Sequence, residues 1–178
     1  MRIITGKFKK ANLFSVPGKE TRPTTDSLKE IIFSLLFSCE DQDVLDLFAG
    51  SGSLGLEALS RGARKVVFVD QSEKSVKTIY QNIQKLNCSL ETEVKKKRVS
   101  AFLKNCDEKF DLIFLDPPYE NNLINPTLDM IIDGNLLNHG GRIVIEHSLR
   151  ENLNENWRDK LVKERNNGSS RVSILEPV

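Results

Sequence analysis

The chain has 178 residues, 39% hydrophobic and 29% charged, which is enough for one ordinary globular domain and leaves little room for a second. Its 26 Lys and Arg against 25 Asp and Glu give a formal net charge of +1, so no overall basic field marks it as a nucleic-acid-binding protein. Three widely spaced cysteines and short apolar runs argue against a disulfide framework, a zinc site, a signal peptide and a membrane span. We therefore expect a cytoplasmic protein without a metal site.

The first 22 residues differ in charge from the rest of the chain. Six Lys and Arg against one Glu give this segment a net charge of +5, so the remaining residues carry −4. Short apolar runs beside turn signals at Thr5-Gly6 and Pro17-Gly18 predict a hairpin-like arm over residues 1–22. We expect this arm to contact an anionic partner. The cations concerned are Arg2, Lys7, Lys9, Lys10 and Arg22.

Residues 23–178 form the second predicted unit, which opens on a helix. Candidate N-cap side chains at residues 24–27, a capping-box spacing from Ser27 to Glu30, and apolar residues at helical spacing up to Leu36 predict that helix. Strands then alternate with helices, which predicts an α/β fold with a mostly parallel sheet covered on both faces. The strands are expected at 44–47, 65–70, about 94–99, 110–115 and 142–146, the helices at 54–59, 72–86 and 125–132, and a closing antiparallel hairpin at 161–165 and 171–175.

A glycine-rich turn lies directly after the first of these strands. It has the pattern G-x-G-x-x-G at Gly50, Gly52 and Gly55, and Asp70 ends the next strand twenty positions after Gly50. Such a turn lets a ligand approach the backbone, and the acid can accept hydrogen bonds from ribose hydroxyls. The negative charge of Asp46 would oppose a pyrophosphate and would favour the cationic groups of S-adenosylmethionine. The predicted cofactor-binding residues are Asp46, Phe48, Ala49, Gly50, Gly52, Gly55 and Asp70.

A second motif, Asp116-Pro117-Pro118-Tyr119, follows the apolar strand 110–115. The paired prolines lack N–H donors, so nearby carbonyl groups can point outward as acceptors, and Asp116 adds a carboxylate. The Tyr119 ring offers a face on which a planar base can stack. These four residues are the predicted catalytic residues, and they suit a base that bears an exocyclic amine.

The two motifs together carry a family resemblance. Residues 46–63 and 116–119 resemble class I S-adenosylmethionine-dependent methyltransferases, and specifically the ribosomal small-subunit methyltransferase D family. The opening residues 1–7, the segment Arg22 to Phe33 and the strand Gly141 to Glu146 resemble that family as well. The similarity covers essentially the whole chain.

The resemblance implies a Rossmann-like fold with a seven-stranded, mostly parallel sheet, an antiparallel last strand and an N-terminal appendage that helps to hold RNA. It implies methyl transfer from S-adenosylmethionine to the N2 amine of a guanine in 16S rRNA, namely guanine 966. We expect a monomer that acts on 16S rRNA within the small ribosomal subunit or an assembly intermediate. Two departures from the family pattern stand out. Ala11-Asn12-Leu13 lacks a cation that relatives carry, and residues 98–101 offer no acid for the adenine amine.

Two other functions remain open. An amino-methyltransferase acting on adenine or cytosine in DNA can carry Asp-Pro-Pro-Tyr as well, but such enzymes usually have a separate target-recognition region, which this chain has no room for. A non-catalytic RNA-binding assembly factor could keep the fold, yet binding alone requires neither the glycine turn nor the carboxylates.

Overall fold

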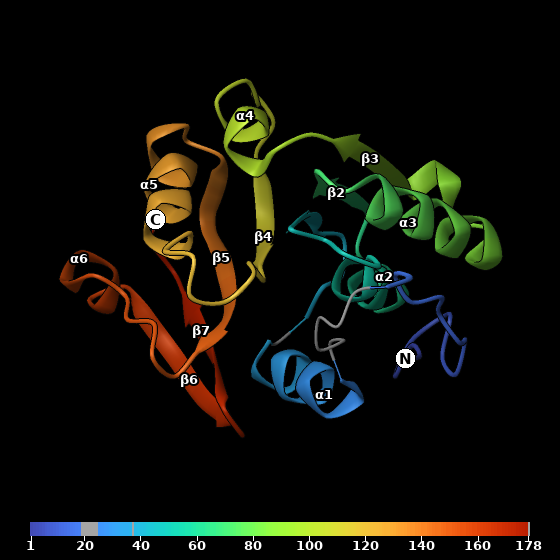
Figure 1. The fold of residues 1–178 in the computed structure, drawn as a ribbon, viewed down its shortest axis with the longest axis horizontal. Coiled ribbons are helices and arrows are strands. Elements are labelled where there is room, and N and C mark those ends of the chain that lie inside the picture. The colour runs from blue at the N-terminus through green and yellow to red at the C-terminus, as the bar shows by residue number, and fades with distance from the viewer. Residues whose placement is uncertain (19–24, 37, 178) are drawn as a thin grey trace.

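The computed structural model describes residues 1–18, 25–36 and 38–177. These residues form a seven-stranded sheet with the strand order β3-β2-β1-β4-β5-β7-β6. Neighbouring strands run parallel from β3 to β5, whereas β7 lies antiparallel between β5 and β6. The predicted seven-stranded, mostly parallel sheet with an antiparallel last strand is therefore confirmed, and Figure 1 shows the helices arranged around it.

The elements follow one another in a regular order. The strands are β1 (Asp43–Leu47), β2 (Lys65–Asp70), β3 (Thr92–Lys96), β4 (Phe110–Leu115), β5 (Leu137–Ser148), β6 (Leu161–Asn167) and β7 (Ser170–Leu175). The helices are α1 (Asp26–Leu35), α2 (Ser53–Ser60), α3 (Glu73–Leu86), α4 (Val99–Leu103), α5 (Ile124–Asp133) and α6 (Glu155–Arg158), with a 3-10 turn at Ser89–Glu91. No described helix has the length and apolar character that a membrane crossing requires.

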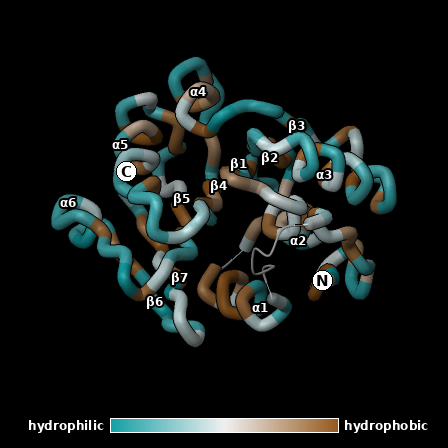
Figure 2. Tube along the Cα trace, in the orientation of Figure 1, coloured by the Kyte–Doolittle hydropathy of each residue, from teal (hydrophilic) through white to brown (hydrophobic). Residues whose placement is uncertain are grey.

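Alternate residues of the central strands point into two separate hydrophobic cores, because successive side chains of a strand face opposite sides of the sheet. One core lies between the sheet and α1, α2 and α3, and the other lies between the sheet and α4, α5 and α6. Figure 2 shows hydrophobic segments concentrated around β1, β4 and α1, and hydrophilic ones toward α6 and the outer turns. Burial on both faces explains why β1, β2 and β4 read as nearly continuous apolar runs.

Four local predictions were wrong or incomplete. The strand expected at 94–99 ends at Lys96, and Val99 instead begins α4, which was not predicted. Helix α6 was also missed. The Thr25 side chain caps α1 by accepting from the Leu28 N–H at 3.1 Å, so the capping box proposed for Ser27 is wrong. Strand β5 begins at Leu137 and runs through Gly140-Gly141, where a turn had been expected.

The N-terminal residues form a short hairpin-like loop that is packed into the body of the protein. Its two sides are joined by hydrogen bonds from the Ile3 N–H to the Ala11 carbonyl and from the Leu13 N–H to the Met1 carbonyl. Ile3 and Leu13 belong to the same hydrophobic core as α2. The fully buried Glu57 of α2 accepts from the backbone N–H groups of Ile4, at 2.7 Å, and Thr5, at 3.1 Å. The segment predicted as an arm is thus hairpin-like over residues 1–13, while its residues 19–22 lie outside the described part of the chain.

A buried ion pair lies beneath this hairpin. The Lys29 ammonium group, on α1, is fully buried 3.9 Å from the Glu57 carboxylate and donates to the backbone carbonyl of Arg2. Arg61 donates to the same carboxylate at 2.8 Å. Because a charge out of water needs close partners, this cluster ties the hairpin, α1 and α2 into one unit.

Candidate functional site

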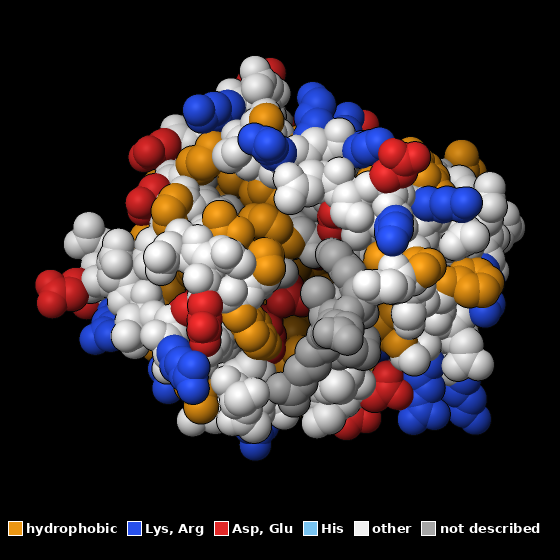
Figure 3. Space-filling model, in the orientation of Figure 1, with side chains coloured by type: hydrophobic (Ala, Val, Ile, Leu, Met, Phe, Trp, Pro, Cys, Tyr) orange, Lys and Arg blue, Asp and Glu red, His pale blue; other side chains and the backbone are white. Residues whose placement is uncertain are grey.

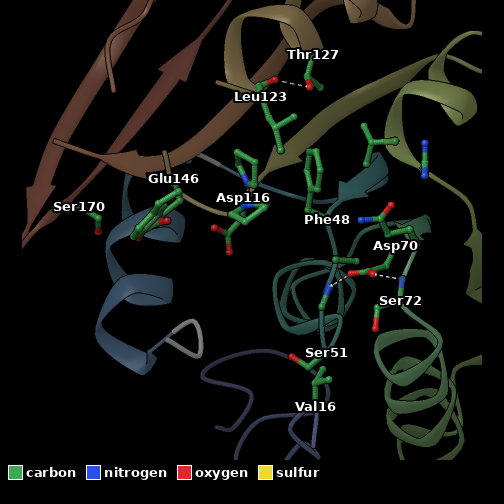
Figure 4. Close-up of a pocket in the computed structure, with 18 of the residues that line it drawn as sticks. Val16, Phe48, Ser51, Asp70, Ser72, Asp116, Leu123, Thr127, Glu146 and Ser170 are labelled. Atoms are coloured by element: carbon green, nitrogen blue, oxygen red, sulfur yellow. Dashed lines mark hydrogen bonds between the residues drawn. The ribbon is translucent and has the colours of Figure 1, made fainter. Parts of the chain in front are cut away.

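A cavity of about 830 Å³ opens at the carboxyl ends of the parallel strands. This is the edge at which open α/β sheets bind ligands, and the volume falls within the range of small-molecule sites. Figure 3 shows acidic side chains in a hollow in the middle of this face, with hydrophobic ones beside it. The close-up in Figure 4 places Asp70 and Ser72 toward one end of the cavity and Asp116 and Glu146 toward the other.

The glycine turn between β1 and α2 forms the floor at the first end. Phe48, Gly50 and Gly52 all have positive φ values, of 58°, 59° and 78°, so the backbone curls tightly here. Phe48, Ala49 and Gly50 line the cavity. A side chain added at Gly50 would meet no other atom closer than 3.9 Å, so this position faces open space.

Gly52 and Gly55, also predicted to bind the cofactor, lie beneath the turn. Neither is among the residues that line the cavity. A Cβ atom at Gly52 would lie 3.2 Å from the Phe68 ring, and one at Gly55 would lie 2.4 Å from it. These two glycines therefore allow α2 to pack closely against β2 beneath the turn.

Asp70 is held in place by the backbone on both sides of it. Its carboxylate accepts from the Gly50 N–H at 2.9 Å and from the Ser72 N–H at 2.7 Å. The residue lines the cavity although only 6% of it is exposed. Each carboxylate oxygen can accept more than one hydrogen bond, so Asp70 can still accept from a ligand.

Asp46 lies below the turn and not in the cavity. It is 1% exposed, and its carboxylate accepts from the Gly55 N–H at 2.9 Å. Burial raises the pKa of Asp46 to about 8, against the opposing effect of the Gly55 hydrogen bond. Burial thus opposes the charged form of Asp46, and its predicted role beside the ligand stays a prediction.

The Asp116–Tyr119 corner forms the opposite end of the cavity, and all four of its residues line it. The Tyr119 hydroxyl donates to Oε1 of Glu146 at 2.5 Å. Burial, followed by this contact with Glu146, raises the pKa of Tyr119 well above its usual range. The phenol consequently stays protonated, and its ring, 36% exposed, presents a surface to the cavity.

Glu146 is the main residue of the site that the sequence analysis did not single out. It lines the cavity, is only 4% exposed and belongs to β5. An acid at the end of an apolar strand was the available signal, as it was for Asp70. Ser15, Val16, Thr25 and Ser100 also line the cavity and were not predicted.

The predicted RNA-binding cations of the N-terminal segment do not share a partner. Arg2 pairs with Asp26 at 2.9 Å, and Lys7 pairs with Glu91 at 3.0 Å. Lys9 and Lys10 are exposed. The fifth predicted cation, Arg22, lies outside the described residues. Within the part of the chain that the structure describes, no group of three or more His, Cys, Asp or Glu could hold a metal ion.

Comparisons with known proteins identify a family and a fold. A family model described as Conserved hypothetical protein 95 matches residues 1–176. The ribosomal RNA small subunit methyltransferase D of Haemophilus influenzae is 37% identical over 174 residues, which cover 94% of this chain and 89% of that protein. A solved structure described as a methyltransferase from Escherichia coli has a TM-score of 0.86 and 30% identity, covering 98% of this chain and 96% of the other. A methyltransferase structure complexed with SAH shares the fold at a TM-score of 0.67 and 14% identity, over 83% of this chain and 48% of the other.

Proposed function

The chain belongs to the ribosomal RNA small-subunit methyltransferase D family, and from that premise we propose that it methylates the N2 amine of a guanine in 16S rRNA. One observation carries the proposal: a single cavity joins the glycine turn and Asp70 to the Asp116–Tyr119 corner. A methyl donor held at the first end would point its reactive group toward a base held at the second. The proposed target is guanine 966, the position that the family resemblance implies.

The first end of the cavity fits S-adenosylmethionine. Asp70 is the acceptor for the ribose hydroxyls, and the backbone at Phe48, Ala49 and Gly50 is open to close approach. Bound there, S-adenosylmethionine supplies a methyl group on a positively charged sulfur. Gly52, Gly55 and Asp46 contribute by fixing the shape of the turn from below.

The second end suits an amine that is a poor nucleophile. Asp116 and the backbone carbonyl beside it accept the two N–H groups of the guanine amine, which draws the nitrogen lone pair out of the ring system. Tyr119 stacks against the base. The nitrogen lone pair forms the new N–C bond as the S–C bond breaks. The two electrons of the S–C bond stay on the sulfur. One N–H proton then leaves to solvent, so no general base of perturbed pKa is needed.

The RNA substrate is held partly outside the cavity. Lys9 and Lys10 on the hairpin are available for phosphate contacts, whereas Arg2 and Lys7 would have to exchange their carboxylate partners. Arg22 completes the proposed RNA-binding set. We propose that the protein acts as a monomer in the cytoplasm, on the small ribosomal subunit or an assembly intermediate.

Nucleoside analysis tests the proposal directly. The purified protein is incubated with S-adenosylmethionine carrying a labelled methyl group and with naked 16S rRNA, small ribosomal subunits or DNA. Mass spectrometry of the digested nucleic acid should find label in N2-methylguanosine, at one position of 16S rRNA. Label in N6-methyladenine or N4-methylcytosine of DNA would favour the DNA alternative, and RNA binding without transfer of label would favour an assembly factor.

A further inference from the structure

The buried carboxylate of Glu146 has no part in the methyl transfer described above. It belongs to β5, is 4% exposed and lines the cavity. A buried acid in a ligand cavity is costly unless something satisfies it. Tyr119 satisfies one carboxylate oxygen, Oε1, by donating its hydroxyl hydrogen at 2.5 Å.

Asp116 and Glu146 lie side by side at the same edge of the sheet. Leu115 of β4 pairs with Ile145 of β5 in parallel register, and each acid is the next residue along its chain. Both residues line the cavity, and Figure 4 shows them at the same end of it. The base-binding end therefore carries two neighbouring carboxylates, and an ionised carboxylate only accepts hydrogen bonds.

Two adjacent acceptors match the hydrogen-bonding edge of one base in particular. Guanine presents its N2 amine and its N1–H next to each other, so both neighbouring positions are donors. Adenine presents its N6 amine beside N1, and cytosine presents its N4 amine beside N3; in both bases the ring nitrogen is an acceptor. A carboxylate facing such a ring nitrogen would repel it.

We propose that Glu146 reads the N1–H of the target guanine while Asp116 accepts from its N2 amine, which makes Glu146 the residue that selects guanine. The inference rests on the proposed function, since it assumes that the base bound at Asp116 is methylated on its exocyclic amine. Tyr119 has a second role in this arrangement. By occupying Oε1 it fixes the rotation of the carboxylate, so that Oε2 is the oxygen left to meet the base.

Replacing one base in the substrate tests this assignment. 2,6-Diaminopurine keeps the N2 amine, but its N1 is an acceptor, so it removes the contact assigned to Glu146. It also replaces the O6 carbonyl of guanine with an amine, and the Glu146 variants below separate the N1 contact from that second change. RNA carrying either guanine or 2,6-diaminopurine at the mapped position is methylated under single-turnover conditions. The wild-type protein should prefer guanine by about 10- to 100-fold, the range for one hydrogen bond to a charged group.

The Glu146→Gln variant should reverse much of that preference. Its amide can still accept from Tyr119 and can donate to N1 of 2,6-diaminopurine, so the guanine preference should fall about tenfold or more. S-adenosylmethionine affinity, measured by calorimetry, should stay unchanged and serves as the check that the variant folds. Glu146→Asp keeps an acceptor and should lose rate while it retains the preference for guanine.

Tyr119→Phe is the matched control for a purely positioning role. It frees the Glu146 carboxylate to rotate but leaves both the acceptor and the ring, so it should lower the preference for guanine less than Glu146→Gln does. If Glu146→Gln preserves the wild-type ratio, Glu146 only holds Tyr119 and the inference is overturned. If the wild-type protein forms no N2-methylguanosine in any RNA, the proposed function fails first and the inference with it.

Discussion

The two ends of the cavity are assembled in different ways. At the end with Asp70, the glycine turn and the carboxylates belong to one continuous stretch, residues 46–72, and backbone N–H groups of that stretch hold the carboxylates. The end with Asp116 combines the corner after β4 with residues of β5 and the start of β7, and a hydrogen bond joins two of its side chains, Tyr119 and Glu146. The first end depends on the shape of its backbone, so substitutions of its glycines should be poorly tolerated. The second depends on which side chains meet, so it can change specificity while the fold is kept.

The largest effect is expected at the second end. Replacing Asp116 with Ala should lower the turnover number by about 100-fold or more, the scale of removing one preorganised electrostatic group. Affinity for S-adenosylmethionine should barely change, because Asp116 lies at the other end of the cavity. Single-turnover kinetics and calorimetry measure the two quantities. Asp116→Asn, which keeps an oxygen acceptor, should retain part of the activity, and near-normal turnover of Asp116→Ala would remove this residue from the mechanism.

At the first end, two neighbouring glycines should separate binding from stability. Gly50→Ala places a methyl group where it faces open space in the cavity, so it should weaken S-adenosylmethionine binding by about tenfold. Gly52→Ala instead directs its methyl group toward Phe68, at 3.2 Å, and should lower the free energy of unfolding more than Gly50→Ala does. Both positions have positive φ, so the strain of an alanine in that backbone conformation applies to both variants and cancels in the comparison. Calorimetry and urea unfolding of the pair would contradict this assignment if the two variants behaved alike.

The buried acid of the first end should make stability depend on pH. The pKa of Asp46 is about 8 in the folded protein and near the ordinary value of about 4 in the unfolded chain. Between these values the folded state binds one more proton than the unfolded state, so this residue's contribution to stability falls as pH rises from about 4 to 8. Asp46→Asn removes that contribution. Urea unfolding at several pH values should show the wild-type protein losing stability relative to the variant across this window, and parallel curves would contradict the raised pKa.

A smaller effect is expected outside both ends, on the hairpin. Lys9→Ala and Lys10→Ala together should reduce the salt dependence of RNA binding by at most about two phosphate contacts. Lys7 is left in place because it already pairs with Glu91. Lys109→Ala with Lys160→Ala is the matched control, since it removes the same charge from exposed positions away from the hairpin. Equal slopes of log affinity against log salt for the two double variants would make the hairpin lysines a solubility feature.

The first end of the cavity could be predicted from the sequence because its information is local. The glycine spacing, the strand before it and Asp70 after it all fall within one βαβ unit, and β2 and β4 have the bounds that their apolar runs predict. For Glu146 the only local signal was an acid at the end of an apolar strand. Glu146 lies beside Asp116 because β4 pairs with β5, and this pairing cannot be predicted from the residues of either strand alone.

Burial and short helices account for the other differences. The Asp46 carboxyl group has a raised pKa because of the packing above it, and a sequence motif gives only the residue type. Helix α4 has five residues, and its N-cap residue, Arg98, makes no side-chain capping hydrogen bond, so no local signal marks its start. Sequence patterns therefore predict elements well where long apolar runs or caps define them.

The buried pair of Lys29 and Glu57 has a consequence for the order in which the chain folds during synthesis. Residues 1–5 are synthesised before Glu57, and the Glu57 carboxylate that binds the Ile4 and Thr5 N–H groups is made about fifty residues later. The hairpin can therefore dock only after α2 has been synthesised. Met1 lines the cavity, so the docking of this hairpin on α2 also completes the wall of the site.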